Sequence, residues 1–211
     1  IQKYQDSIKI AEQRLALEEA ALNGIEELLI KAKEIAVGES SSNRTATTRS
    51  QMKAFVDQLI KEAIAIGHTR HGSAYIFGGT RTNAAPFDSN NQYVGAHEKW
   101  KVEVKKGITI EPNHTGQEIL LDSGVLEALQ NLSDALGNND VAAIQAAMNQ
   151  IDRAMVNIHN LHADIGVKMQ RIETMAQEHE DTILALTERR SSLEDADLVE
   201  SINRLLAREN A

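Results

Sequence analysis

Apolar residues recur every three or four positions along the N-terminal part of the chain, which is the spacing of one face of an α-helix. The line covers Ile1–Ala36, and Glu18 is its one polar member. Leu28 and Ile35 widen the apolar face, and a wide face is typical of a helix that packs against two or more neighbours. The pattern predicts a long first helix that ends near Gly38.

Further helices follow from the same spacing. A second helix is predicted over Thr45–Ile66, with Gly67 as its stop, and a short helix over Val125–Leu136. Asp140 can cap the last helix, in which the spacing of three and four continues over Met148–Leu193 and resumes beyond it. The first and last helices are both long, and we expect them to be antiparallel with the two chain ends side by side.

The stretch between residues 75 and 87, which reads YIFGGTRTNAAPF, interrupts the helical pattern. Its first two aromatic residues alternate with the two-residue period of a strand. Gly78 and Gly79 allow backbone angles that are closed to other residues, and Pro86 forbids a continuing helix. The Gly-Gly-Thr sequence lacks the spacing of a phosphate-binding loop, so it predicts a tight turn. We expect seven residues to determine this β element: Tyr75, Phe77, Gly78, Gly79, Thr80, Pro86 and Phe87.

A second β signal follows at residues 100–110. Trp100, Val102 and Val104 alternate with charged residues, and two isoleucines with the same alternation follow after Lys106–Gly107. Two alternating runs joined by a short glycine-containing turn predict a β-hairpin.

Together the elements predict a mainly α protein with a small β insertion. We expect an elongated, rod-like multi-helix bundle whose long terminal helices are antiparallel and have β-hairpins between them. Residues 1–71 are predicted to form the N-terminal half of the helical rod, residues 72–120 the β-hairpin element, and residues 121–211 the C-terminal half of the same rod. The heptad lines also fit a coiled coil between copies of the chain, but the wide first face and the antiparallel return favour an intramolecular bundle.

The composition narrows the classes of function. The chain has 211 residues, a formal net charge of −9 and a pI near 5.3, and this acidity argues against nonspecific nucleic-acid binding. Only 3% of the residues are aromatic, so we expect a core of thin Leu, Ile and Ala layers. The lack of cysteine excludes disulfides and thiolate metal sites. No apolar run approaches the ~20 residues of a membrane span, so no membrane insertion is expected.

The histidines raise the question of a metal site. Three pairs have a spacing of three residues: His68 and His71, His159 and His162, and Glu111 and His114. A metal site in a bundle usually needs Glu-x-x-His pairs on facing helices, and the third pair straddles Pro112 in a predicted turn. We therefore interpret the histidines as solvated or hydrogen-bonded. No nucleophile elbow, zinc motif or dinucleotide fingerprint occurs, so we expect no catalytic residue, metal or cofactor.

Three basic residues fall on the apolar line of the last helix: His162, His179 and Arg190. We expect their side chains to reach solvent at the edge of the bundle, and the alternative is a contact with a partner subunit. Glu18, the polar member of the first line, is predicted to pair with one of these cations.

The order of the elements and three sequence segments resemble a known family. Long helix, second helix, β element, hairpin and very long last helix follow the plan of the flagellin-like axial proteins of the bacterial flagellum. Tyr75–Phe87 is similar to the aromatic-Phe-x-Gly-Thr-x-Thr-x-x-x-Pro-Phe signature of the hook-associated protein 3 family. Ala163–Met175 resembles the Ile-Gly-x-x-x-x-Arg-Ile/Leu segment of the wider superfamily, and Leu193–Leu206 resembles its Glu-Asp-Ala-Asp segment.

This resemblance implies a structural adaptor that joins the flagellar hook to the filament, without enzymatic activity. It implies self-association in the axial structure, hook-associated protein 1 as partner on the hook side, flagellin on the filament side, and an export chaperone. It also implies export through the flagellar channel, without a cleaved signal peptide, to an extracellular location. The alternatives are the filament subunit flagellin and, in another class, a coiled-coil scaffold or signalling module, against which the predicted hairpin argues.

The resemblance also sets expectations about extent. Many flagellins carry a large outer domain after the β element, whereas residues 88–120 leave room here for one or two hairpins. The outer domain is therefore expected to be minimal or absent. Because the sequence begins inside a helical pattern at Ile1 and lacks the terminal segments of the family, we expect a fragment that is monomeric.

Overall fold

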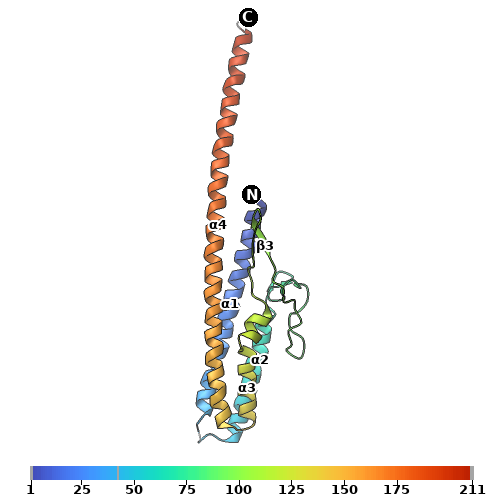
Figure 1. Cartoon of the computed structure of the whole chain (residues 1–211), viewed down its shortest axis with the longest axis vertical. Coiled ribbons are helices and arrows are strands. Elements are labelled where there is room, and N and C mark those ends of the chain that lie inside the picture. The colour runs from blue at the N-terminus through green and yellow to red at the C-terminus, as the bar shows by residue number, and fades with distance from the viewer. Residues whose placement is uncertain (1, 42, 210–211) are drawn as a thin grey trace.

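The computed structural model describes the backbone of residues 2–41 and 43–209, and the side-chain exposure of residues 3–41 and 43–194. The chain forms an elongated helical bundle with a small β element on one side (Figure 1). In chain order the elements are α1 (Gln2–Glu39), α2 (Ala46–Gly67), β1 (Arg70–His71), β2 (Ala74–Tyr75), β3 (Val102–Lys105), β4 (Ile108–Ile110), the π-helix η1 (Gln117–Asp122), α3 (Val125–Gly137) and α4 (Val141–Glu209). The predicted mainly α fold with a small β insertion is confirmed.

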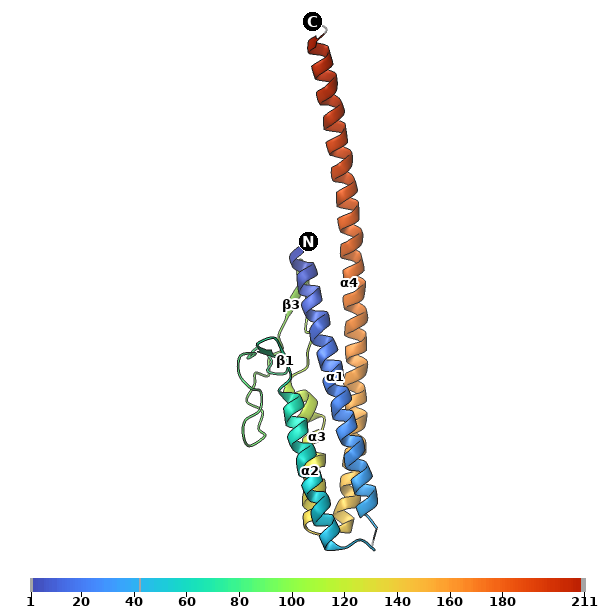
Figure 2. The same ribbon diagram turned by 180° about the vertical axis from the view of Figure 1, so that it is seen from behind.

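The wide apolar face of α1 is covered within one chain. α1 lies antiparallel along α4, α3 packs against α4 and α2, and α2 returns to α1 (Figures 1 and 2). An ion pair of 2.6 Å between Lys33 Nζ and Asp152 Oδ1 links α1 to α4 on the surface. The intramolecular bundle predicted from the width of the face is therefore what the structure contains.

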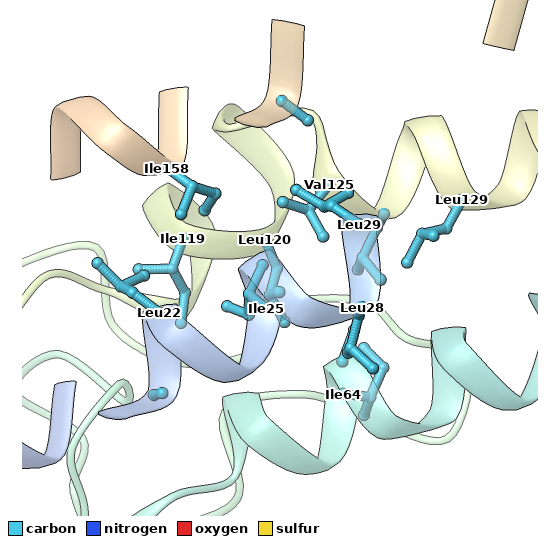
Figure 3. Packing of buried hydrophobic residues seen from close by; sticks show 14 of the residues in the cluster. Leu22, Ile25, Leu28, Leu29, Ile64, Ile119, Leu120, Val125, Leu129 and Ile158 are labelled. Carbon is cyan, nitrogen blue, oxygen red and sulfur yellow. The ribbon is translucent and has the colours of Figure 1, made fainter. Parts of the chain in front are cut away.

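The core of the rod is built from aliphatic layers. Figure 3 shows Leu22 and Ile25 of α1 beside Ile119 and Leu120 of η1, with Ile158 of α4 beyond them; all five side chains are fully buried. Among the described residues, the buried aromatic side chains belong to the β element. This division agrees with the low aromatic content of the sequence.

α4 is an unbroken helix of 69 residues, against 38 in α1. At ~1.5 Å per residue these lengths correspond to roughly 104 Å and 57 Å. α4 therefore continues far beyond the N-terminal end of α1 (Figure 2). The prediction that the chain ends lie side by side is wrong, because matching periodicity in two helices gives no information on where each one stops facing the other.

Two of the helix boundaries follow local hydrogen bonds that the sequence signals. Thr45 caps α2, since its side chain accepts a hydrogen bond of 3.2 Å from the backbone N–H of Thr48. Asp140 caps α4 in the same way, with 3.0 Å from the N–H of Ala143 to Oδ1. Gly67 is the last residue of α2, as predicted.

The two hairpins differ in how well they were predicted. β3 and β4 pair antiparallel around Gly107, whose φ of +76° fits a glycine turn, with a register irregularity between Glu103 and Lys105. The predicted hairpin at residues 100–110 is confirmed. β1 and β2 form a second, very short hairpin around Gly72, and it begins at Arg70, before the expected start of the β element at residue 72.

The strand expected from the alternation of Tyr75 and Phe77 is wrong beyond its first residue. β2 ends at Tyr75, and the next two side chains, Ile76 and Phe77, are both buried. The chain turns at this point, because the two glycines that follow fold it back onto itself. The burial of consecutive side chains is a property of this turn, which the period of a strand does not describe.

The segment before α3 contains a helical turn that was not predicted. η1 covers Gln117–Asp122, partly within the range assigned to the β-hairpin element. The side chain of Glu118 accepts a hydrogen bond of 2.8 Å from the N–H of Thr115, and the Thr115 hydroxyl accepts one of 3.3 Å from the N–H of Glu118. This reciprocal pair is a capping box, which starts a helical segment after Pro112 and Gly116.

Candidate functional site

The turn at Gly78 and Gly79 holds two distant parts of the β element together. The N–H of Ala96 donates to the carbonyl oxygen of Gly78 at 3.0 Å, and the N–H of Thr80 donates to that of Glu98 at 2.8 Å. Gly79 has a φ of +62°, and a Cβ on this residue would overlap the carbonyl oxygen of Ala96. A side chain at either glycine is therefore incompatible with this packing, since a Cβ on Gly78 would overlap the carbonyl oxygen of Arg81.

An aromatic cluster lies beneath this turn. The rings of Phe87 and Tyr93 meet edge to face with 5.5 Å between centroids. Tyr93 Oη donates to the carbonyl oxygens of Ala96 at 2.8 Å and Phe77 at 3.2 Å. Burial of this phenol, together with the negative charge of Glu118, raises the pKa of Tyr93 to about 12. Tyr93 thus stays neutral, and its hydrogen bonds to the backbone of Phe77 and Ala96 stabilise the turn.

Glycines also permit the contact between the cluster and the rod. The ring of Phe87 packs against Gly67, the last residue of α2, and against Gly116, which precedes η1. A Cβ on Gly116 would lie 2.7 Å from Phe87 Cε2, closer than atoms can approach. His68 Nε2 lies 3.2 Å from the carbonyl oxygen of Phe87. The β element is therefore attached where α2 ends and η1 begins.

The seven residues predicted to determine the β element do not form one cluster. Phe77, Gly78, Gly79, Pro86 and Phe87 are buried, whereas Tyr75 is half-buried and Thr80 is exposed. Tyr75 lies toward the surface, where the guanidinium carbon of Arg70 lies 4.2 Å from its ring centroid. Its backbone still takes part, because the N–H of Tyr75 donates to the carbonyl oxygen of Thr82 at 2.8 Å.

A buried polar cluster joins the rod to the segment that leaves the hairpin. Glu18 of α1 is completely buried. Its carboxylate accepts hydrogen bonds from the backbone N–H of His114 at 3.1 Å and from Asn113 Nδ2 at 3.2 Å, and it contacts His114 Nδ1 at 2.6 Å. A buried carboxylate is tolerated only when its hydrogen-bonding capacity is used in this way.

His114 connects three elements through one ring. Its Nδ1 faces Glu18 of α1, and its Nε2 lies 3.1 Å from Asp164 Oδ2 of α4. Lys168, one turn further along α4, contacts the same Asp164 oxygen at 2.7 Å. The ring of His114 thus lies between a carboxylate of α1 and a carboxylate of α4.

Arg14 extends the cluster toward the hairpin. Its guanidinium carbon lies 4.2 Å from the centroid of the Trp100 ring, a cation–π distance. Asn113 Nδ2 also donates to the carbonyl oxygen of Arg14 at 3.1 Å. Burial lowers the pKa of Arg14, because a charged guanidinium loses solvation there. Trp100, the one tryptophan of the chain, thus lies over α1.

Two carboxyl groups around His114 have pKa values below the usual range. Burial would raise the pKa of Asp164, but the hydrogen bond and charge of Lys168, with the charges of His114 and Lys99, lower it overall. Burial likewise opposes ionisation of Glu118, and the hydrogen bonds from Lys99 and Thr115 outweigh it, so that its pKa is also lowered. Both groups favour the folded state in their charged form.

These contacts correct the predicted role of the basic residues on the last helix. Glu18 pairs with His114, and none of the three predicted cations reaches it. His179 is buried, with its Nε2 2.8 Å from the carbonyl oxygen of Val104, so its side chain does not reach solvent. Arg190 is exposed and lies 3.6 Å from Glu194, and His162 is partly buried, 3.8 Å from Glu26. The pairing failed because His114 lies in a turn, outside the helical lines.

The other histidines fit the hydrogen-bonded interpretation. His71 Nε2 lies 3.1 Å from Gln13 Oε1, and His159 Nε2 lies 3.0 Å from Glu26 Oε1. Within the described residues, no three His, Asp or Glu side chains converge as metal ligands would. None of the helices in the described part of the chain combines the length and the hydropathy that a membrane crossing requires.

The part of α4 beyond Ile183 differs from the rest of the helix in the exposure of its side chains. Beyond Ile183 the described side chains are exposed up to Glu194, and they include Leu184, Leu186 and Leu193, which are 52–64% exposed. The N-terminal end of α1 lies shortly before this part of α4, since Tyr4 stacks on His179. A long helical segment with exposed leucines thus extends from the bundle.

Comparisons with known proteins indicate which proteins this chain resembles. No family profile matches the sequence. The flagellar hook-associated protein 3 of Escherichia coli (strain K12) is 24% identical over 238 residues, and the alignment covers 99% of this chain and 74% of that protein. The resemblance to hook-associated protein 3 is therefore confirmed over nearly the whole chain.

Solved structures show the same fold. A flagellar hook-associated protein-3 from Legionella pneumophila has a TM-score of 0.80 at 13% identity, covering 92% of this chain and 96% of that one. The flagellar junction protein FlgL from Legionella pneumophila has a TM-score of 0.72 at 14% identity, covering 85% of this chain and 92% of that one. These solved structures thus share the overall fold of this chain.

Proposed function

We propose that this chain is the hook–filament junction protein of a bacterial flagellum. The observation that carries the proposal is its similarity to a hook-associated protein 3 over 99% of the chain, which includes the β element as well as both long helices. A likeness limited to helices would be weak support, because bundles share composition. Here the glycine turn, the aromatic cluster and the hairpin fall within the matched region.

The shape of the molecule is consistent with an axial structural protein. A rod of parallel and antiparallel helices can lie along the axis of a tube, with its outer faces toward neighbouring copies. The β element projects from the side of the rod away from α4 (Figures 1 and 2) and is fixed there by buried contacts. In this proposal the seven β-element residues maintain the angle of the projection, and none of them is catalytic.

The partners in this proposal are those that the resemblance to the hook-associated protein 3 family implies. The protein would associate with further copies of itself, with hook-associated protein 1 on the hook side and with flagellin on the filament side, after delivery by an export chaperone. It would act outside the cell, reached through the flagellar export channel without a cleaved signal peptide. The same proposal assigns no enzymatic activity.

Residues 1–71 and 121–211 form the two halves of one rod domain in this proposal, and residues 72–120 form the β element. The connection between Phe87 and β3 contains one isolated bridge, from Phe87 to Tyr93. In this proposal the outer domain is minimal or absent. The 211-residue chain is expected to be monomeric, with assembly depending on the axial structure.

A gene deletion in the source organism tests the proposal. Hooks without filaments in electron micrographs, with unpolymerised flagellin in the medium, are the expected result. Loss of flagellin itself from the medium would identify the chain as the filament subunit, which the match to a hook-associated protein makes the weaker candidate. Normal filaments and swimming would instead favour a scaffold protein outside the flagellum.

A further inference from the structure

The hairpin of β3 and β4 is anchored on both sides by polar contacts with the rod. On the side before β3, Lys99 Nζ lies 2.7 Å from Glu118 Oε1 of η1. On the side after β4, Asn113 Nδ2 donates to the buried carboxylate of Glu18 at 3.2 Å. We call residues 100–112, which lie between these two anchors and contain the hairpin, the clasp.

The clasp reaches α4 through an irregularity in its strand pairing. The register of β3 and β4 shifts between Glu103 and Lys105, which leaves Val104 as the extra residue of a β-bulge. The side chain of Val104 is fully buried, and its carbonyl oxygen lies 2.8 Å from Nε2 of His179. The bulge therefore turns a backbone acceptor of the hairpin toward α4.

His179 is the residue at which the clasp, α1 and α4 meet. The ring of Tyr4, near the start of α1, stacks on the ring of His179 with 5.9 Å between centroids. Lys105 Nζ, next to the bulge, lies 3.0 Å from Glu178 Oε2. Among the described side chains of α4, His179 is the last one that is buried. The clasp thus contacts α4 where its packing against the rod ends, beside the N-terminal part of α1 (Figure 2).

The part of the clasp that covers α1 contains a poorly paired cation. Arg14 is buried beneath Trp100. Its Nη1 reaches Asn113 Oδ1 only at 3.5 Å, and its Nε has no acceptor among the described residues. A buried donor of this kind destabilises the closed arrangement, because water would bind it if Trp100 moved away.

The end of the clasp is also incompletely packed on α4. A cavity of about 260 Å³ lies between residues 109–112 and the side chains of Lys168, Arg171 and Ile172. The hairpin packs mainly against α1, while its hydrogen bond and its ion pair to α4 both come from the bulge, at Val104 and Lys105. The attachment to α4 is therefore concentrated at one point.

We propose that the clasp opens as one unit about its two anchors while the rest of the rod stays folded, and that in its closed position it holds the start of α1 against α4 at His179. Opening breaks the hydrogen bond and the ion pair to α4 and exposes the buried arginine to water. The exposed part of α4 then begins nearer to Ile172 than to Ile183. The clasp is thus a conformational device that sets how much of α4 is free, and it operates in the isolated chain, independently of the proposed function.

Hydrogen exchange of the purified chain tests the clasp, because segments that open together exchange together. His179→Ala removes the donor to the bulge, and His159→Ala, which removes an exposed ring of the same helix that contacts Glu26, is the matched control. His179→Ala is expected to raise the exchange rates of β3, β4 and the first turns of α1 together, at least about threefold for a lost hydrogen bond, with α2 and α3 unchanged. His159→Ala should raise none of them. Faster exchange confined to α4, or equal effects of the two variants, would overturn the proposal.

A cross-link that keeps the clasp closed tests the proposal with the opposite sign and without loss of a buried side chain. The chain has no cysteine, so Lys105→Cys and Glu178→Cys, at the exposed ion pair, can be joined by a short bismaleimide. Exchange of β3, β4 and the first turns of α1 should slow at least about threefold relative to the two single variants with blocked cysteines. Acrylamide should also quench the fluorescence of Trp100, the one tryptophan, less strongly. Unchanged exchange and quenching would mean that the clasp does not open as a unit, and the proposal would be wrong.

Discussion

Gly78 and Gly79 are adjacent, yet the structure requires glycine at each for a different reason. Gly79 has a φ of +62°, a backbone conformation that strains any residue with a Cβ. Gly78 has no positive φ, but the carbonyl oxygen of Arg81 occupies the place of its side chain. The sequence predicted a tight turn from both residues, and only the structure separates conformation from space.

Replacing Gly78 with valine should therefore destabilise the β element more than replacing Thr82 with valine. The Gly78→Val side chain forces the turn open, at a cost of about 1–3 kcal/mol. Thr82→Val changes the volume little at a half-buried position and should cost under about 0.5 kcal/mol. Urea unfolding measures both values, and equal stability of the two variants would contradict the packing described here.

Removal of the Glu18 carboxylate should be among the most destabilising changes in the rod. Glu18→Ala leaves the N–H of His114 and Asn113 Nδ2 buried without their acceptor and costs about 3–5 kcal/mol. Glu19→Ala, one residue away and exposed, is the matched control and should change stability by less than about 0.5 kcal/mol. Guanidinium unfolding measures the stability of both variants. Similar losses of stability in the two variants would mean that the buried polar cluster around Glu18 does not stabilise the rod.

At the scale of elements, η1 depends on a capping box that has a titratable member. Because the pKa of Glu118 is lowered in the folded state, its contribution to stability is present above the ordinary glutamate pKa of about 4.3 and is lost as the pH falls below that value. Lys99 Nζ, 2.7 Å from the carboxylate, is one source of this contribution.

Glu118→Gln separates the charge from the cap. Glutamine keeps the capping hydrogen bonds but cannot lose a charge, so the variant should be less stable than the parent at neutral pH and should lose less stability on acidification. Glu118→Ala removes the cap as well and should cost a further ~0.5–2 kcal/mol at neutral pH. The free energy of unfolding of each variant is measured at neutral and at acidic pH. An equal loss of stability on acidification in the parent and in Glu118→Gln would contradict the role assigned to the charge of Glu118.

The sequence predicted correctly those elements that are determined by residues close together in the chain. Apolar spacing located the helices, Thr45 and Asp140 marked two of their starts, and alternation located the hairpin at residues 100–110. The capping box at Thr115 and Glu118 was also visible in the sequence, but the nearby proline and glycine directed the interpretation to a turn.

The polar cluster could not be predicted because its members are distant in the chain. Glu18 and His114 are 96 residues apart, and a buried acid on a helical line indicates only that some partner exists. Periodicity suggested a cation on the facing helix. The partner comes instead from the turn before η1, whose path depends on the packing of the whole β element.

At the scale of the molecule, α4 packs against α1 over part of its length, and the part of α4 beyond Ile183 is exposed. Tyr4 near the start of α1 stacks on His179, with 5.9 Å between ring centroids, and this contact lies near the end of the paired region. Beyond Ile183 the leucines of α4 are more than half exposed. Stability and assembly should therefore depend on different parts of α4.

Two truncations of α4 separate these roles. A chain that ends at Ile183 keeps every buried residue of the described rod, so its melting temperature should fall by less than about 2 °C. A chain that ends at Ile165 loses the buried Ile172 and His179 and about 2–5 kcal/mol, which corresponds to a fall of roughly 5–15 °C at this size. Calorimetry on the two purified chains measures both. In cells, the protein shortened at Ile183 should fold yet fail to support filaments, because the segment that extends from the bundle is the one left for assembly. A large loss of stability on removal of that segment alone would show that it is already packed against a second copy in solution, and the chain would then not be the monomer expected here.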